Sequence, residues 1–231
     1  MNLRSRLAII AAKLTSKLIR LCHMGSGMSL PGAVASRIDP HILSVLSAMV
    51  REKIIVVTGT NGKTTVNSLL RQALLHEGKS VVSNETGANM PNGIVSAFVL
   101  HADCLGRFRA DFACIEVDEI AASSVLGQLQ PDCIMVTNIF RDQLDRFGEI
   151  DILTEKLCQA ISQVPKAVLT INCDDPLLGA LARRCPNPLV TCGVSEPAFH
   201  PPADSLVREG VFCPFCGEKL RYDLLHYGHL G

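Results

Sequence analysis

The chain has 231 residues, of which 48% are hydrophobic and 19% charged, and its formal net charge is zero. This much apolar sequence supports a buried core and excludes a wholly disordered chain. Zero net charge, with no tryptophan and only two tyrosines, argues against a nucleic-acid partner. The length suits one large domain, or one domain with a small appendage.

The N-terminal residues predict an amphipathic helix. Leu3, Leu7, Ile10, Leu14 and Leu18 recur at helical spacing, and the helix carries a basic face. Lysines interrupt the apolar stretch and no small-residue cleavage site follows it, so it does not resemble a secretory signal. We expect a helical lead over residues 1–50 that packs on the surface of the following domain. The alternative is contact with a membrane surface.

Short apolar runs alternate with helical patterns along most of the chain. The expected strands cover residues 53–57, 79–82, 112–117, 133–137, 167–171 and 189–192. The expected helices cover about residues 40–50, the segment from the glycine turn to residue 76, and residues 120–129, 150–164 and 176–184. This alternation predicts an α/β fold with a doubly wound, mostly parallel sheet over residues 51–204. Such sheets bind ligands beyond the carboxyl ends of their strands.

The segment IIVVTGTNGKTT runs from an apolar strand through a glycine turn into a helix. Gly59 and Gly62 allow the backbone to curl so that successive N–H groups point at phosphate oxygens, and the helix adds its positive end. Lys63 would reach the β- and γ-phosphates, and the Thr64 hydroxyl would join a Mg²⁺ shell. The loop is a variant of the usual phosphate-binding pattern, because Val57 stands where the first glycine is expected. It predicts ATP binding.

A glutamate ends the apolar run DFACIEV, where its carboxylate would face the glycine turn. This residue, Glu116, is a candidate Mg²⁺ ligand together with Thr64, because Mg²⁺ prefers oxygen ligands and takes one or two carboxylates. The alternative is a strand-end charge that meets solvent. Asp118 and Glu119 are weaker candidates, because a charge at such a junction often caps a helix.

The ten cysteines mostly lie in apolar runs. A chain with a core this large needs no disulfides, so we expect a reducing, cytoplasmic compartment and small core cysteines, including Cys192 at a strand end. Cys213 and Cys216 differ, because Cys-Pro-Phe-Cys-Gly predicts half of a structural zinc site in an incomplete ribbon over residues 205–231. His226 and His229 could complete a Cys₂His₂ set.

Several segments together resemble one enzyme family. TGTNGKTT is similar to the ATP site of Mur ligases and of their relatives, the folylpolyglutamate and cyanophycin synthetases. NETGANMPNG at 84–93, IEVDE at 115–119, VTNIFRDQLDRFGE at 136–149 and INCDDP at 171–176 extend the resemblance. CPFCG followed by YGHLG is similar to the family members that amidate lipid II.

The resemblance implies a Mur ligase central ATPase domain with Lys63 and Glu116 as its catalytic residues and Mg²⁺ held by Thr64 and Glu116. It implies ATP contacts from Asn138 and, through the NxDDP segment, from Asn172 and Asp175. The complete expected ATP site is Gly59, Thr60, Asn61, Gly62, Lys63, Thr64, Thr65, Asn138, Asn172 and Asp175. One departure is Gln143, where relatives commonly have histidine, which places a second metal site in doubt.

The implied activity is ATP-dependent amidation of the α-carboxylate of D-glutamate in lipid II, at the cytoplasmic face of the membrane. Ammonia would come from a GatD-like glutaminase partner in a heterodimer, because the chain has no Gly-x-Cys-x-Gly nucleophile elbow. Family members place another cysteine pair beyond this point. The resemblance therefore implies a chain cut inside the ribbon, without its C-terminal domain and inactive alone. The alternatives are a folylpolyglutamate-synthetase-like ligase and a non-ligase phosphate-loop NTPase with a zinc-binding module.

Overall fold

The computed structural model of the chain describes residues 1–22, 28–84, 88–139, 149–193, 212–213 and 216–220. Within these residues, strands form one six-stranded sheet in the order β2-β3-β1-β4-β5-β6. The strands are β1 (Lys53–Thr58), β2 (Val81–Ser83), β3 (Phe112–Glu116), β4 (Cys133–Val136), β5 (Val168–Asn172) and β6 (Leu189–Cys192). Every neighbouring pair is parallel, so the predicted α/β class and mostly parallel sheet are confirmed.

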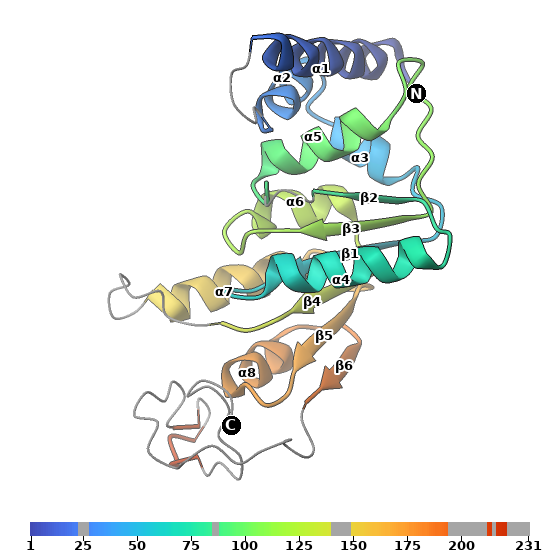
Figure 1. Cartoon of the computed structure of the whole chain (residues 1–231). Helices are drawn as coiled ribbons and strands as arrows, with labels where there is room; N and C mark the ends of the chain where they lie inside the picture. The colour runs from blue at the N-terminus through green and yellow to red at the C-terminus, as the bar shows by residue number, and fades with distance from the viewer. Residues whose placement is uncertain (23–27, 85–87, 140–148, 194–211, 214–215, 221–231) are drawn as a thin grey trace.

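Helices connect the strands and cover both faces of the sheet. They are α1 (Leu3–Leu21), α2 (Leu30–Ile38), α3 (Ile42–Ser47), α4 (Lys63–His76), α5 (Pro91–His101), α6 (Ala122–Leu129), α7 (Glu149–Ser162) and α8 (Pro176–Arg184). In Figure 1, α4 lies in front of the sheet and α6 lies behind it. Because parallel strands need crossover connections, this two-sided arrangement is the expected one.

The core lies between the central strands and the helices that cover them. Val56, Ile115, Ile134 and Leu169 come from four adjacent strands and are each fully buried. Side chains of this size contribute roughly 1.5–3 kcal/mol each when removed from water. Packing at these positions therefore holds in place the strand ends from which the candidate site is built.

Two helices lie where the sequence pattern did not predict them. Helix α2 begins inside a segment rich in glycine and serine, residues 25–32, with Pro31 in its first turn, where a missing backbone N–H costs nothing. Helix α5 begins inside the Asn/Gly-rich segment at 84–92 and also starts with a proline, Pro91. Its residues Ile94, Val95, Phe98 and Val99 are buried, so it has little of the polar face that marks a surface helix. The expected helix over 40–50 is the shorter α3.

Helix α1 was predicted, but its leucine pattern indicated the wrong contact face. Helix α1 contacts α2 and α5. The buried apolar side chains on its contact face are Ala8, Ile9, Ala12 and Ile19. The leucines at the predicted spacing are exposed instead. Small residues allow helix axes to approach closely, which explains why the alanine face makes the contact.

The cysteines do not all lie in the core. Cys114 and Cys158 are buried, but Cys22, Cys104, Cys173 and Cys192 are exposed. The prediction of core positions is therefore wrong for the last four, and for Cys192 in particular because β6 is an edge strand whose residues are all exposed. In the described part of the chain, no helix is long and apolar enough to cross a bilayer.

Candidate functional site

The candidate site lies at the carboxyl ends of β1 and β3. These strands are neighbours, with Val57 paired to Glu116. The chain leaves β1 towards α4 on the front face and leaves β3 towards α6 on the back face (Figure 1). Connections that diverge to opposite faces open a crevice between two strand ends, which is where parallel α/β sheets bind ligands. The segment at 59–62, here called the glycine loop, and Glu116 flank this crevice.

The backbone of the glycine loop depends on its two glycines. Gly59 has φ 121°, and a Cβ atom built there would lie 2.4 Å from Thr137 Oγ1 and 2.7 Å from the carbonyl oxygen of Asn138. Gly62 has φ 80° and directly precedes α4. The first hydrogen bond of the helix runs from Val66 N–H to Gly62 O. The preceding N–H groups of the first turn therefore lack partners inside the helix, and they form an anion-binding end.

The side chain of Asn138 holds the glycine loop from the end of β4. Its Oδ1 accepts a hydrogen bond from Asn61 N–H at 2.8 Å, and its Nδ2 donates to Asn61 O at 3.0 Å. Thr137 Oγ1 donates to the same Asn61 carbonyl at 2.8 Å. Asn138 therefore binds the loop backbone. Its expected contact with ATP stays a prediction.

Lys63 is folded back onto the loop and is paired with an acidic side chain. Its Nζ donates to Gly59 O at 2.5 Å and to Thr60 O at 3.0 Å. It also lies 3.4 Å from Glu119 Oε2, and the two side chains are only 12% and 9% exposed. A phosphate entering the loop would compete with Glu119 for this ammonium group.

Glu116 is held rigidly, with one carboxylate oxygen left available. Its backbone N–H donates to Asn84 Oδ1 at 2.9 Å, and Asn84 Nδ2 donates to its carbonyl oxygen at 2.7 Å. Asn89 Nδ2 donates to Glu116 Oε1 at 3.0 Å. Glu116 Oε2 is buried and has no hydrogen-bond partner in the described part of the chain. A buried, unpartnered carboxylate oxygen is costly, so its chemistry fits a divalent cation of the Mg²⁺ type.

The remaining predicted ATP residues fall into two groups. Asn61, Thr64 and Thr65 are exposed at the mouth of the glycine loop. Asn172 ends β5 and Asp175 follows it. Asn172 Oδ1 accepts from Asp174 N–H, and Asp175 caps α8 by accepting from Leu177 N–H at 2.8 Å. These two side chains stabilise a turn and a helix end, and their contacts with ATP stay predictions.

The role of Glu119 in the site was not predicted from the sequence. Asp118 and Glu119 were both predicted as possible helix caps, but neither caps α6: Asp118 accepts from Ile120 N–H at 2.9 Å in the turn before the helix, whose N-cap Ala121 has no side-chain cap. Glu119 instead turns into the site and pairs with Lys63. Sequence reasoning also missed Asn84 and Asn89 as supports of Glu116. Their only signal was the asparagine-rich composition of the segment at 84–92.

Cys213 and Cys216, here called the knuckle cysteines, lie on a tight turn. Cys213 N–H donates to Glu218 O at 2.7 Å, and Gly217 N–H donates back to Cys213 O at 3.0 Å. Phe212 and Lys219 form an antiparallel bridge around this turn, which carries Cys216. Two cysteines three positions apart on such a turn suit half of a tetrahedral zinc site. His226, His229 and Gln143 lie outside the described residues.

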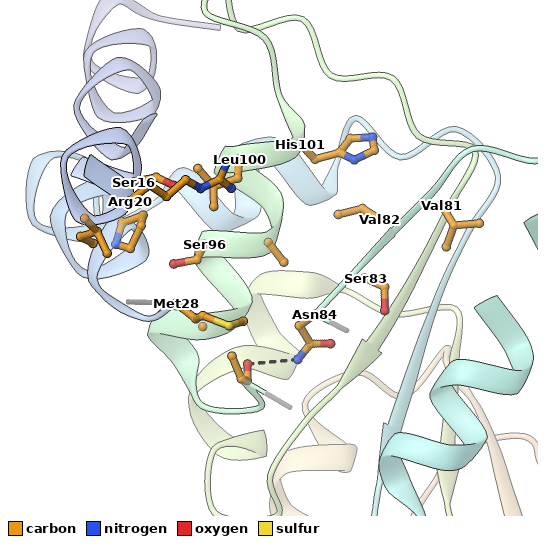
Figure 2. A pocket seen from close by; sticks show the side chains of 15 residues that line it. Ser16, Arg20, Met28, Val81, Val82, Ser83, Asn84, Ser96, Leu100 and His101 are labelled. Atoms are coloured by element: carbon orange, nitrogen blue, oxygen red, sulfur yellow. Dashed lines mark hydrogen bonds between the residues drawn. The ribbon is translucent and has the colours of Figure 1, made fainter. Parts of the chain in front are cut away.

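A pocket of about 430 Å³ lies beside the site, between α1, α5 and the edge strand β2. Ser16 and Arg20 line it from α1, and Ser96 and His101 line it from α5 (Figure 2). Asn84 lies at its border and donates to Ala88 O at 3.1 Å. The same side chain binds the Glu116 backbone, so Asn84 connects the lining of this pocket to the strand end that carries Glu116.

These features define a parallel α/β domain with a glycine loop after its first strand and a buried glutamate on the neighbouring strand. The Mur ligase middle domain family matches residues 57–211. The chain belongs to the Mur ligase family.

Curated relatives match the chain along its whole length. It is 37% identical over 230 residues to "Lipid II isoglutaminyl synthase (glutamine-hydrolyzing) subunit MurT" of Staphylococcus aureus (strain COL). It is 36% identical over 231 residues to the protein of the same name from Streptococcus pneumoniae (strain ATCC BAA-255 / R6). The matches cover 99% and 100% of this chain and 50% of each relative, so the chain spans half the length of these proteins.

The solved structure of MurF ligase from Thermotoga maritima in complex with ADP shares the fold. The TM-score is 0.53 at 19% identity, over 70% of this chain and 37% of that chain. At this identity the likeness supports the fold alone.

Proposed function

We propose that this chain is the nucleotide-binding part of a MurT-type ligase subunit, which amidates the α-carboxylate of D-glutamate in lipid II. The proposal rests on the similarity over the whole chain to two MurT subunits, together with a site in which Lys63 lies beside Glu119 and Glu116 ends the strand next to β1. We propose a GatD-like glutaminase as partner, in line with the words "glutamine-hydrolyzing" in the names of those relatives. The cytoplasmic face of the membrane is the proposed place of work.

ATP would bind with its phosphates in the glycine loop. Lys63 leaves Glu119 and its two loop carbonyls to bind the β- and γ-phosphates, and the free N–H groups at the start of α4 donate to phosphate oxygens. The Asn138 bonds keep the Asn61 backbone fixed while this happens. A loop fixed in advance loses little entropy when the ligand arrives.

A Mg²⁺ ion would be held by Glu116 Oε2 and the Thr64 hydroxyl, the former rigid and unpartnered, the latter exposed. When bound, it neutralises charge on the transferred phosphoryl group. Asn89 orients the carboxylate through Oε1 and leaves Oε2 for the cation.

The reaction needs little acid–base assistance from the chain. A carboxylate oxygen of the substrate attacks the γ-phosphorus, the bond to the β-phosphate oxygen breaks, and ADP leaves. Ammonia then attacks the acyl carbon of the acyl phosphate, losing a proton as inorganic phosphate leaves. Lys63 and the loop N–H groups stabilise the charge that spreads over the phosphoryl oxygens.

We also propose that Cys213 and Cys216 hold a structural Zn²⁺ with two further ligands from residues past the knuckle. The zinc content of freshly purified protein tests this proposal. About one zinc per chain is expected. Cys213→Ser should release it and leave nucleotide affinity unchanged. If zinc is absent from the purified protein, or if its removal leaves the melting temperature unchanged, the proposal of a structural zinc is wrong.

ATP binding by the chain itself tests the nucleotide site. Lys63→Ala should weaken Mg-ATP binding by at least about tenfold, because a charge-assisted contact is lost. Lys79→Ala is the matched control, since Lys79 forms an exposed pair with Glu52. Glu116→Gln should reduce the Mg²⁺ dependence of ATP affinity while Mg-free binding persists. Unchanged ATP affinity in Lys63→Ala would refute the site.

Amidation tests the proposed reaction. A protein that contains this chain and has the full length of its MurT relatives should amidate lipid II with ATP and ammonium at alkaline pH. Alkaline pH raises the fraction of neutral, nucleophilic NH₃. Glutamine in place of ammonium should give no product without the partner. Amidation with glutamine alone would refute the need for a partner, and ATP hydrolysis indifferent to lipid II would favour the non-ligase NTPase.

A further inference from the structure

Helix α1 leaves a row of large apolar side chains in solvent. The row consists of Leu3, Leu7, Ile10, Leu14, Leu18 and Leu21, which are between 38% and 73% exposed. Its members recur every three or four residues, so they share one face of the helix. Over 19 residues this face is about 28 Å long. We refer to these six residues as the leucine stripe.

The leucine stripe is not needed to attach α1 to the fold. The contact with α2 and α5 is made by the other side of the helix, where Ala8, Ile9 and Ala12 are fully buried. Helix α1 is the outermost element at the top of Figure 1, with α2 and α5 between it and the sheet. The stripe therefore faces away from the body of the domain.

Cations flank the leucine stripe. Helix α1 contains five basic residues and no acidic residue. At 100° per residue, Arg6 and Lys17 lie next to the stripe along one edge, whereas Lys13 donates to Leu100 O of α5 and Arg20 lines the pocket beside α5. Arg6, Lys17 and Arg20 are exposed, and no ion pair to them occurs in the described part of the chain.

We propose that α1 docks on an anionic phospholipid bilayer, with the leucine stripe in the interface and the basic edge against lipid phosphates. An apolar face beside unpaired cations is the pattern of helices that lie in the plane of a membrane surface. The helix does not span a bilayer. A second copy of the chain fits less well, because two α1 helices would bring cations against cations along the same seam.

This docking surface goes beyond the proposed function and does not depend on it. Its residues are separate from Lys63, Glu116 and the glycine loop, so membrane binding should occur without nucleotide. For an enzyme of a lipid-linked substrate, docking would convert a search in three dimensions into one along the membrane plane.

Flotation of the whole chain with lipid vesicles tests the proposal. Vesicles containing about a third phosphatidylglycerol should carry the protein to the top of the gradient, and pure phosphatidylcholine vesicles should carry much less of it. Leu7→Glu/Leu14→Glu should lower binding at least about tenfold, because two apolar anchors are lost and two negative charges added. Leu69→Glu/Ile152→Glu is the matched control, because Leu69 and Ile152 are exposed apolar residues on α4 and α7. Its binding should stay within about twofold of wild type.

The basic edge is tested separately. Arg6→Gln/Lys17→Gln should weaken binding to the anionic vesicles about tenfold and have little effect on the neutral ones. Circular dichroism of every variant should match wild type, since all substituted side chains are exposed. The proposal would be overturned if the wild type did not bind anionic vesicles. It would also be overturned if Leu69→Glu/Ile152→Glu lost as much vesicle binding as Leu7→Glu/Leu14→Glu. A wild-type dimer that Leu7→Glu/Leu14→Glu converts to a monomer, without vesicle binding, would assign the stripe to a second copy.

Discussion

The ammonium group of Lys63 lies 3.4 Å from the carboxylate of Glu119, and both side chains are largely buried. In this structure the lysine that should bind phosphate is therefore neutralised by a residue of the same site. Because Glu119 is negative, its carboxylate would also repel an incoming phosphate. The pair thus holds Lys63 near its working position and opposes nucleotide binding at the same time.

Glu119→Gln should strengthen binding of ADP in the absence of Mg²⁺ by at least about threefold, since it removes a largely buried negative charge that competes with phosphate for Lys63. Titration calorimetry measures the affinity. Glu52→Gln, which breaks the exposed pair with Lys79, should leave it unchanged. Weaker binding in Glu119→Gln would mean that Glu119 helps to hold the nucleotide or its cation.

Gly59→Ala should destabilise the protein by more than about 2 kcal/mol, because positive φ and a steric clash act together. The new Cβ would lie 2.4 Å from Thr137 Oγ1. Gly78→Ala is the matched control: Gly78 has φ 74° and nothing within 4 Å of its Cβ position. The control should lose only about 1 kcal/mol, from backbone strain alone. Chemical denaturation measures both unfolding free energies, and equal losses in the two variants would contradict the predicted clash.

The sheet could be predicted because its central strands are buried on both faces and read as continuous apolar runs. The glycine loop could be predicted because its glycines, lysine and threonines are consecutive. Helix α5 could not, because it is buried nearly all round and follows a segment typical of loops. The leucine pattern predicted helix α1, but a helix with an alanine face and a leucine face can pack by either one.

The supports of the site could not be predicted because they join residues far apart in the sequence. Asn138 binds Asn61 across 77 positions, and Asn84 binds Glu116 across 32. Each is a small polar residue at a strand end, where turns use asparagine for purely local reasons. Only the strand order reveals which of these asparagines meet the glycine loop and which meet Glu116.

Asn138→Ala should weaken both folding and nucleotide binding, because it removes two bonds that fix the Asn61 backbone. We expect a loss of about 1–2 kcal/mol in unfolding free energy. Asn187→Ala is the control, since Asn187 Nδ2 likewise bonds two carbonyls, of Val164 and Ala167, away from the site. It should lose similar stability and keep wild-type ATP affinity. Normal ATP affinity in Asn138→Ala would show that the loop needs no such support.

Cys114 should be unreactive in the folded protein at pH 8. It lies in β3, and burial raises the pKa of its thiol to about 11 from the usual 9.0. The thiolate is the reactive form, and almost none is present at pH 8. Iodoacetamide followed by peptide mass mapping should therefore label the exposed Cys22 and Cys104 first. Labelling of Cys114 at the same rate in native protein would contradict its burial.

The same pKa shift makes stability fall at alkaline pH. Because the folded pKa of Cys114 lies above the unfolded value, the folded state keeps its proton longer as pH rises. The contribution of Cys114 to the free energy of unfolding is therefore complete below about pH 9. It is lost between about pH 9 and 11, at up to roughly 1.4 kcal/mol per pH unit. Cys114→Ala should reduce this fall in urea unfolding measured from pH 8 to 11, whereas Cys104→Ala, at an exposed position, should not. An alkaline slope unchanged in Cys114→Ala would show that other groups carry it, such as the Cys185 thiol, whose pKa is raised by burial and by its contact with Cys158.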